Sequence, residues 1–119
     1  MIRQGDVFWV EFSGSGSEPS GRRPAVVVQS DRFNASAIRT VIVLPVTSTL
    51  RLGGMPGNVS LRKGEASLPK PSVINVSQPV AIDRGRLVAR LGSISRSRLR
   101  QVLAGICLVI GVDVVVQGT

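Results

Sequence analysis

The stretch Gly21-Arg22-Arg23-Pro24-Ala25-Val26-Val27-Val28-Gln29-Ser30 joins a polar segment to a short apolar run. A run of this length, bounded by glycine, proline and polar residues, is typical of a strand buried on both faces. We therefore predict a strand at residues 25–29. Pro24 has a fixed φ and no N–H, so it suits the first residue of that strand. Arg23 would then lie at a rigid rim, where its guanidinium could bind an anion.

The neighbouring segments predict two further strands and a loop. Residues 7–12 combine a continuous apolar run with alternation, which predicts a first strand. Residues 13–21 are rich in glycine and serine, so we expect a mobile loop of about nine residues. Residues 40–48 predict a third strand, in which Pro45 marks an edge or a bulge. The second and third strands thus each carry a proline.

The rest of the chain predicts short strands and one helix. Strands are expected at residues 59–61, 72–76, 79–83 and 86–93. A helix follows with Ser95 as N-cap, Gly111 as stop and an apolar stripe at Leu99, Val102, Leu103, Ile106 and Ile110. Cys107 should be buried within it, and the apolar tail at 112–116 must pack somewhere, with a second copy as one candidate. This order predicts one domain over 1–119, mainly β with α: a small, curled, mainly antiparallel barrel with a C-terminal helix.

The charged and aromatic content of the chain limits the classes of molecule that it is expected to bind. The 119 residues are 43% hydrophobic and 18% charged, which is typical of a folded protein. The net charge is +8, and thirteen of the fifteen basic residues are arginines. Such a balance favours a nucleic acid, an acidic protein or an anionic membrane surface, with solubility alone as the alternative. The four aromatic residues make platforms for stacking bases scarce.

Other absences in the sequence exclude whole classes of site. The chain has no histidine and a single cysteine, so neither a Cys/His metal site nor an intrachain disulfide is expected. Arg3 and Asp6 interrupt the one candidate signal peptide. The longest apolar run, residues 102–112, is too short to span a bilayer. We expect a cytoplasmic protein with no metal, no cofactor and no membrane partner.

Five ordered blocks of the sequence resemble the MazF/PemK toxin family: residues 5–10, 16–18, 21–28, 30–31 and 46–48. A weaker match continues through residues 68–69, 72–73, 78, 82–83 and 86–87. The resemblance implies an SH3-like barrel of the PemK/CcdB type with a C-terminal helix, acting as a homodimer. It implies a toxin of a type II toxin–antitoxin system that cuts single-stranded mRNA at a short sequence without a metal. It also implies a cognate acidic antitoxin whose extended segment lies across the RNA groove.

The same resemblance assigns two catalytic residues. The family's arginine before the proline falls on Arg23, and its threonine at the end of the third strand falls on Thr47. One departure concerns the substrate. Val80 stands where many members have an arginine two residues after the glutamine that falls on Gln78, and Pro79 adjoins it. The contacts on that edge, and hence the cleavage sequence, are left open.

Metal-free RNA cleavage uses the ribose 2′-OH as nucleophile and needs two proton transfers and stabilisation of the phosphoryl charge. Arg23 suits charge stabilisation, because its fork matches two phosphate oxygens; its very high pKa makes it a poor acid. Thr47 could hydrogen-bond a phosphoryl oxygen, with Ser48 as helper. Glu18 could orient Arg23 or act as base, and its alternative is simple solvation. Without the family, Arg23 could merely close the loop and Thr47 be an ordinary β-former.

Further residues are candidate contacts with RNA or antitoxin. Arg22 should point the opposite way from Arg23 and bind rather than catalyse. Arg51, Arg84 and Arg86 are candidates for phosphate contacts, with a solvated surface as the alternative. Arg96, Arg98 and Arg100 lie where the helix dipole disfavours cations, which favours an outside acidic or phosphate partner, with a solvated face as the alternative.

Two other functions fit the same sequence. One is a toxin of the same fold that inhibits a protein target, such as DNA gyrase. The other is a non-catalytic nucleic-acid-binding module, for which the charge of +8 would suffice.

Overall fold

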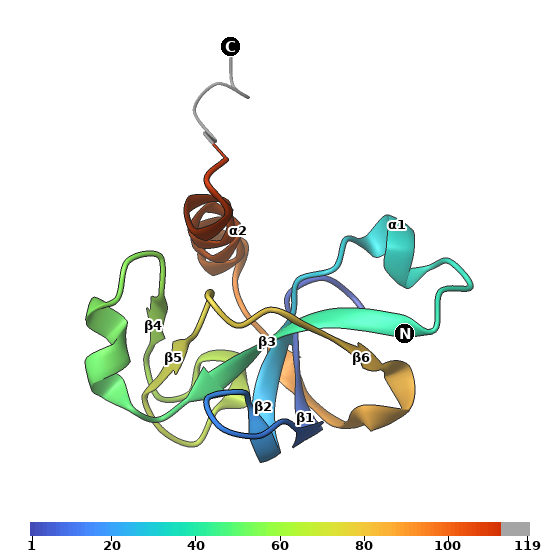
Figure 1. Cartoon of the computed structure of the whole chain (residues 1–119), viewed down its shortest axis with the longest axis horizontal. Coiled ribbons are helices and arrows are strands. Elements are labelled where there is room, and N and C mark those ends of the chain that lie inside the picture. Colours follow the sequence, from blue (N-terminus) through green and yellow to red (C-terminus); the bar gives the residue numbers. More distant parts are fainter. Residues whose placement is uncertain (113–119) are drawn as a thin grey trace.

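Within residues 1–112, seven antiparallel strands form a sheet, and a helix follows them (Figure 1). The computed structural model describes residues 1–112, so most of the predicted tail at 112–116 lies outside the described residues. The strands are β1 Asp6–Ser13, β2 Ser20–Val27, β3 Thr40–Thr47, β4 Val59–Leu61, β5 Ser72–Ile74, β6 Val80–Asp83 and β7 Leu87–Ser93. The α-helices are α1 Asp31–Asn34 and α2 Arg96–Ile110; 3-10 turns span Leu50–Gly54, Glu65–Ser67 and Arg84–Arg86.

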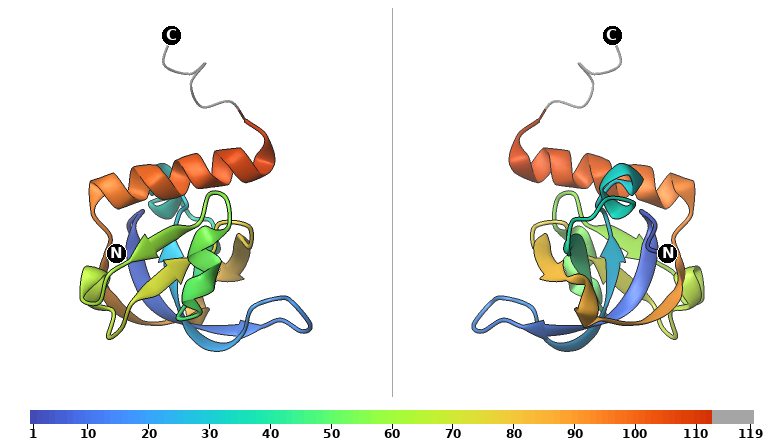
Figure 2. Two further views of the ribbon diagram at one scale, coloured as in Figure 1. Left: turned by 90° about the vertical axis from the view of Figure 1, so that its left-hand side faces the viewer. Right: turned by 90° about the vertical axis from the view of Figure 1, so that its right-hand side faces the viewer.

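The strands follow the order β4-β5-β3-β2-β1-β7, and β6 pairs with β3. The sheet curls, and α2 lies across one end of it (Figure 1). The β1–β2 hairpin projects on the side away from α2 (Figure 2). The prediction of a small, curled, mainly antiparallel barrel with a C-terminal helix is confirmed.

The apolar run of β2 is buried on both faces of the sheet, as predicted. Val26 and Val28 belong to a core that also takes in Val102 of α2. Ala25 and Val27 belong to a second core on the other face, with partners from β1, β3 and β6. Because neighbouring side chains along a strand point to opposite faces, one unbroken apolar run supplies both cores.

The start of β2 corrects the prediction. The strand begins at Ser20 and ends at Val27, so Pro24 lies in its middle and the loop has only six residues, 14–19. Gly14 N–H donates to Pro19 O at 2.9 Å and closes the hairpin. Counted from that bond, Pro24 opposite Trp9 is a non-hydrogen-bonded pair, so β1 needs no N–H from Pro24. The register of the hairpin therefore allows Pro24 to lie inside β2, whereas the sequence pattern predicted it at the start of the strand.

Helix α2 has both predicted ends. Ser95 Oγ accepts the Arg98 N–H at 3.1 Å, and Gly111 ends the helix at φ +95°. The helix approaches the barrel at the buried Gly105, beside Gly57. Two expectations about its stripe are wrong. Ile110 is 68% exposed, and Cys107 is only half-buried, because the last turn receives little cover from the barrel.

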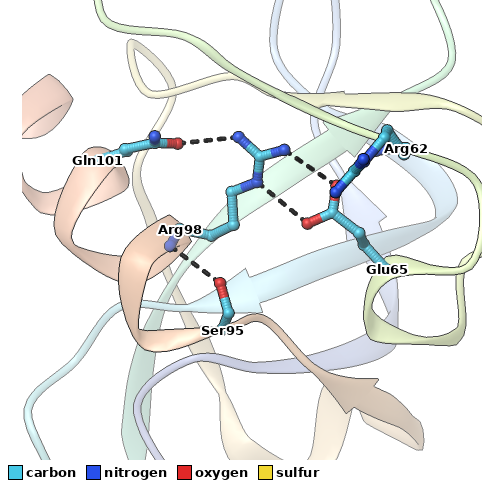
Figure 3. Close-up of polar contacts among 5 residues, drawn as sticks. All are labelled: Arg62, Glu65, Ser95, Arg98 and Gln101. Carbon is cyan, nitrogen blue, oxygen red and sulfur yellow. Dashed lines mark hydrogen bonds and ion pairs between the residues drawn. The ribbon is translucent and has the colours of Figure 1, made fainter.

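Arg98 has an internal partner, which corrects the expectation of an outside one. Its Nε and Nη2 donate to the two carboxylate oxygens of Glu65 at 3.0 and 3.1 Å, and its Nη1 donates to Gln101 (Figure 3). Both charged side chains are about three-quarters buried. This two-point ion pair ties α2 to the 3-10 turn at 65–67.

Stability should depend on pH through Glu65. The hydrogen bond from Arg98 holds the pKa of this carboxyl below its usual range, and the Arg62 N–H adds to the effect. Its stabilising contribution is present above the unfolded-state pKa of about 4.3 and is lost as pH falls through the folded-state value. We expect Glu65→Gln to lower the free energy of unfolding by about 1 kcal/mol at pH 7 and by much less at pH 3.

Urea unfolding at the two pH values measures this difference. The exposed Glu11→Gln is the matched control and should change little at either pH. An equal loss at pH 7 and pH 3 for Glu65→Gln would show that the carboxylate charge is not what stabilises the contact.

Candidate active site

The strands β2 and β3 part at the point where the two predicted catalytic residues lie. Their ladder ends with Ala25 opposite Pro45. Beyond that pair β3 turns to β5 and places Thr47 opposite Val73. Arg23 and Thr47 are each two residues beyond the last pair, so alternation puts both side chains on one face of the fork. Counted from the bond of Val28 N–H to Ile42 O, the next hydrogen-bonded pair would join Pro24 to Val46. Pro24 has no N–H for it, which favours separation of the strands here.

Two hollows meet at Arg23 and Thr47. The first hollow, about 400 Å³, has walls that include Trp9, Arg22, Ser48 and Lys70. The second hollow, about 190 Å³, is lined by loop residues 16–19, by Ser20 at the start of β2, and by Asn75 and Gln78. Arg23 and Thr47 line both. These two residues are therefore the part of the wall that the two hollows share.

The free donors at this point suit an anion. Arg23 is exposed, and its Nε donates to Ser20 O at 2.9 Å, which orients the guanidinium without using its two terminal amino groups. Within residues 1–112 no carboxylate forms an ion pair with it. Thr47 is half-buried, and its Oγ1 accepts the Thr49 N–H at 3.1 Å, so its hydroxyl hydrogen can be donated elsewhere. Together they offer a guanidinium fork and a hydroxyl to a phosphate.

The predicted helpers take different places. Ser48 lines the first hollow. Glu18 lines the second, where its Oε1 accepts the Ser15 N–H at 3.2 Å and not a bond from Arg23. Gln78 Nε2 donates to Ser17 O at 2.6 Å, and its Oε1 accepts from Asn75. Gln78 thus fastens the hairpin loop over the second hollow as well as lining it.

A third hollow, about 580 Å³, continues the surface along β6. It shares Glu18, Pro19 and Gln78 with the second hollow, and Val80 and Arg86 also line it. Arg86 Nη1 donates to Ser13 Oγ at 2.9 Å. The three hollows are linked through these shared lining residues, and we refer to them together as the groove.

Two predicted arginines lie outside this groove. Arg84 donates to the carbonyl oxygens of Ile38 at 2.8 Å and Asn34 at 3.0 Å, so it holds the segment after α1 in place. Arg51 is exposed on the 3-10 turn at 50–54 and lines none of the three hollows.

Sequence reasoning missed Trp9 and Lys70. The Arg22 guanidinium lies 5.7 Å from the centre of the Trp9 ring, and both residues line the first hollow. Arg23 lines the first hollow and the second, whereas Arg22 lines only the first of these two. Lys70 stands between Pro69 and Pro71, and that rigid Pro-Lys-Pro segment was the signal available in the sequence.

In residues 1–112, no three His, Cys, Asp or Glu side chains gather closely enough to hold a metal ion. None of the helices described there is long and apolar enough to cross a membrane.

The chain is similar in sequence to known toxins. Residues 3–110 match the family of PemK-like, MazF-like toxins of type II toxin–antitoxin systems. Endoribonuclease MazF2 of Mycobacterium bovis and endoribonuclease MazF6 of Mycobacterium tuberculosis are each 38% identical to the chain over 107 residues, which are 89% of this chain and 94% of each relative.

Solved structures give the same result. MazF from Deinococcus radiodurans has a TM-score of 0.78 at 26% identity, covering 92% of this chain and 96% of that one. A mycobacterial endoribonuclease in complex with its cognate antitoxin shares the fold, with a TM-score of 0.79 at 15% identity and coverage of 95% and 98%. The fold and the sequence are thus those of a toxin of the endoribonuclease class. The chain belongs to the PemK-like, MazF-like toxin family.

Proposed function

We propose that this toxin cuts single-stranded mRNA at a short sequence, without a metal, through attack of a ribose 2′-OH on the adjacent phosphorus. The observation that carries the proposal is the meeting of Arg23 and Thr47 between two hollows. A phosphate at this point would have one neighbouring nucleotide in each hollow. Holding both neighbours helps to bring the attacking and leaving oxygens into line.

The reaction assigns a role to each donor. The bond from the 2′-oxygen to phosphorus forms, and the bond from phosphorus to the 5′-oxygen breaks. The departing 5′-oxygen takes a proton from solvent water, which leaves a 2′,3′-cyclic phosphate and a 5′-OH. The Arg23 fork binds two phosphoryl oxygens, and the Thr47 hydroxyl donates to one as their negative charge grows. Glu18 is the one carboxylate that lines the second hollow, and in this scheme it accepts the 2′-OH proton.

The test is purified protein, free of antitoxin, on a long single-stranded RNA in excess EDTA. Discrete fragments are expected, while DNA of the same sequence should stay intact because it lacks the nucleophile. Intact RNA from a demonstrably folded protein would reject the proposal and turn attention to a protein target such as DNA gyrase. The 38% identical relatives named endoribonucleases favour the nuclease over that target and over a binding module.

The proposed protein partner is an acidic antitoxin, and we place the pair in the cytoplasm with the mRNA. Structural relatives of this fold are described in complex with antitoxins. In this chain the groove beside Arg23 also carries Arg22 and Lys70, and the whole sequence has a net charge of +8. An extended acidic segment lying in the groove would neutralise these charges and exclude RNA.

The family resemblance implies a homodimer, and the end of α2 supplies a surface for it. Leu108, Val109, Ile110 and Val112 are 45–68% exposed, and residues 101–112 carry no charge. A second copy of the chain would bury these side chains. We expect Leu108→Glu to shift the protein from dimer to monomer at micromolar concentration, because dimerisation would bury an unpaired charge.

Light scattering coupled to size exclusion measures the mass. The exposed Val88→Glu on β7 is the matched control and should leave the dimer intact. A wild type that is monomeric at high concentration would reject this surface as a dimer interface.

A further inference from the structure

The first hollow contains an aromatic face beside the phosphate site. Trp9 is half-buried on β1, and it lines the hollow that Arg23 and Thr47 also line. Of the four aromatic residues in the chain, it is the one that lines this hollow. The hollow of about 400 Å³ has room for a nucleobase, and a base stacks well on an indole.

Arg22 occupies the ring face in this structure, but its hold is weak. Its guanidinium is 5.7 Å from the ring centre, near the outer limit of a cation–π contact. Across residues 1–112 no hydrogen bond or ion pair from its side chain accompanies that contact. An exposed cation–π contact corresponds to a factor of about two to five in an equilibrium constant. A base stacked on an aromatic ring corresponds to about five- to a hundredfold, so the base should displace Arg22.

We propose that Trp9 is a base-binding residue, on which one of the two nucleotides flanking the cut phosphate stacks. This inference rests on the proposed nuclease function and adds a subsite to it. Once displaced from the ring, Arg22 binds a neighbouring phosphate of the RNA. Lys70 lines the same hollow and adds a second positive charge there. The two paired strands supply all of these groups: Trp9 lies on β1, and both arginines lie on β2.

The sole tryptophan makes the test direct, because intrinsic tryptophan fluorescence reports Trp9 alone. The probe is a 2′-O-methyl oligonucleotide that spans the mapped cut and cannot be cleaved. A set of derivatives carries one abasic position each. We expect the parent to quench Trp9 emission on binding. An abasic site at one flanking position should abolish the quench and weaken binding by about five- to a hundredfold.

Protein variants complete the cycle. Trp9→Leu should weaken binding of the oligonucleotide without an abasic site by the same factor as the abasic site weakens binding to wild type. In the Trp9→Leu protein, the abasic site should cause no further loss of affinity. Trp9→Phe keeps a stacking ring in case leucine harms folding, and it should retain most of the affinity. Phe33→Leu changes an aromatic that is 53% exposed on α1, away from the hollow, and should behave as wild type.

A wild type that cleaves RNA but shows no quench, and equal affinity across the abasic series, would overturn the subsite while leaving the nuclease intact. A wild type that does not cleave RNA at all would remove the proposed function, and the subsite with it.

Discussion

Arg23→Ala is expected to reduce the rate of RNA cleavage by about a thousandfold. The guanidinium is the group best placed to stabilise charge that develops on the phosphate, and an arginine in that role is worth about 10³ or more in related phosphoryl chemistry. Arg23→Lys keeps the charge but loses the two-point fork, so it should recover only a small part of the rate. Single-turnover cleavage of one mapped RNA site measures both values.

Folding should not explain that loss. Arg23 is exposed, and its side chain makes one hydrogen bond, to Ser20 O. Thermal unfolding of Arg23→Ala should therefore stay close to wild type. Arg32→Ala on α1 removes an equally exposed charge away from the groove and should cleave at the wild-type rate. Full activity in Arg23→Ala would remove Arg23 from the mechanism and leave Thr47 without its partner.

Gly105→Ala is expected to destabilise the protein by about 2–3 kcal/mol, a loss of about 10 °C in melting temperature. Alanine is the better helix former by about 1 kcal/mol, so propensity alone predicts a gain. The close approach of α2 to the barrel decides against that gain. A Cβ on Gly105 would clash with the carbonyl oxygen of Gly57 and would lie 3.2 Å from Val76 Cγ1, both parts of the packed barrel.

Ala104→Gly on the exposed side of the same helix is the matched comparison. It should cost about 1 kcal/mol, the ordinary propensity difference. Chemical unfolding of the two variants beside wild type gives both free energies. A Gly105→Ala protein as stable as wild type would show that α2 can move off the barrel at no cost, and that the Gly57–Gly105 contact does not fix its position.

The features that were predicted correctly from the sequence are those that depend on neighbouring residues along the chain. The continuous run at residues 25–28 predicted a strand buried on both faces, and the Ser95 and Gly111 signals are local to one helix. The placing of Arg23 beside Thr47 came from family resemblance. The register of β2 and β3 now gives it a physical basis, because both residues are two steps past the last pair.

Long-range contacts account for what was wrong or missed. The length of β2 depends on its register with β1, which no run within β2 reveals. Arg84 and Arg98 looked like free surface charges, yet their partners are carbonyls at positions 34 and 38 and the carboxylate of Glu65. Trp9 reads as an ordinary strand residue until Arg22 and Lys70 are brought to the same hollow.

In the proposed reaction, Arg23 and Thr47 bind the phosphate of the RNA while the neighbouring ribose 2′-OH attacks its phosphorus. The most direct test is a synthetic RNA with a single 2′-deoxynucleotide immediately 5′ of the mapped cut, incubated in excess EDTA beside the all-ribose strand. We predict that the all-ribose strand is cut to a 2′,3′-cyclic phosphate and a 5′-OH, and that the substituted strand stays whole at that site. Cleavage of the substituted strand at the same site, or cleavage only after magnesium is restored, would contradict the account.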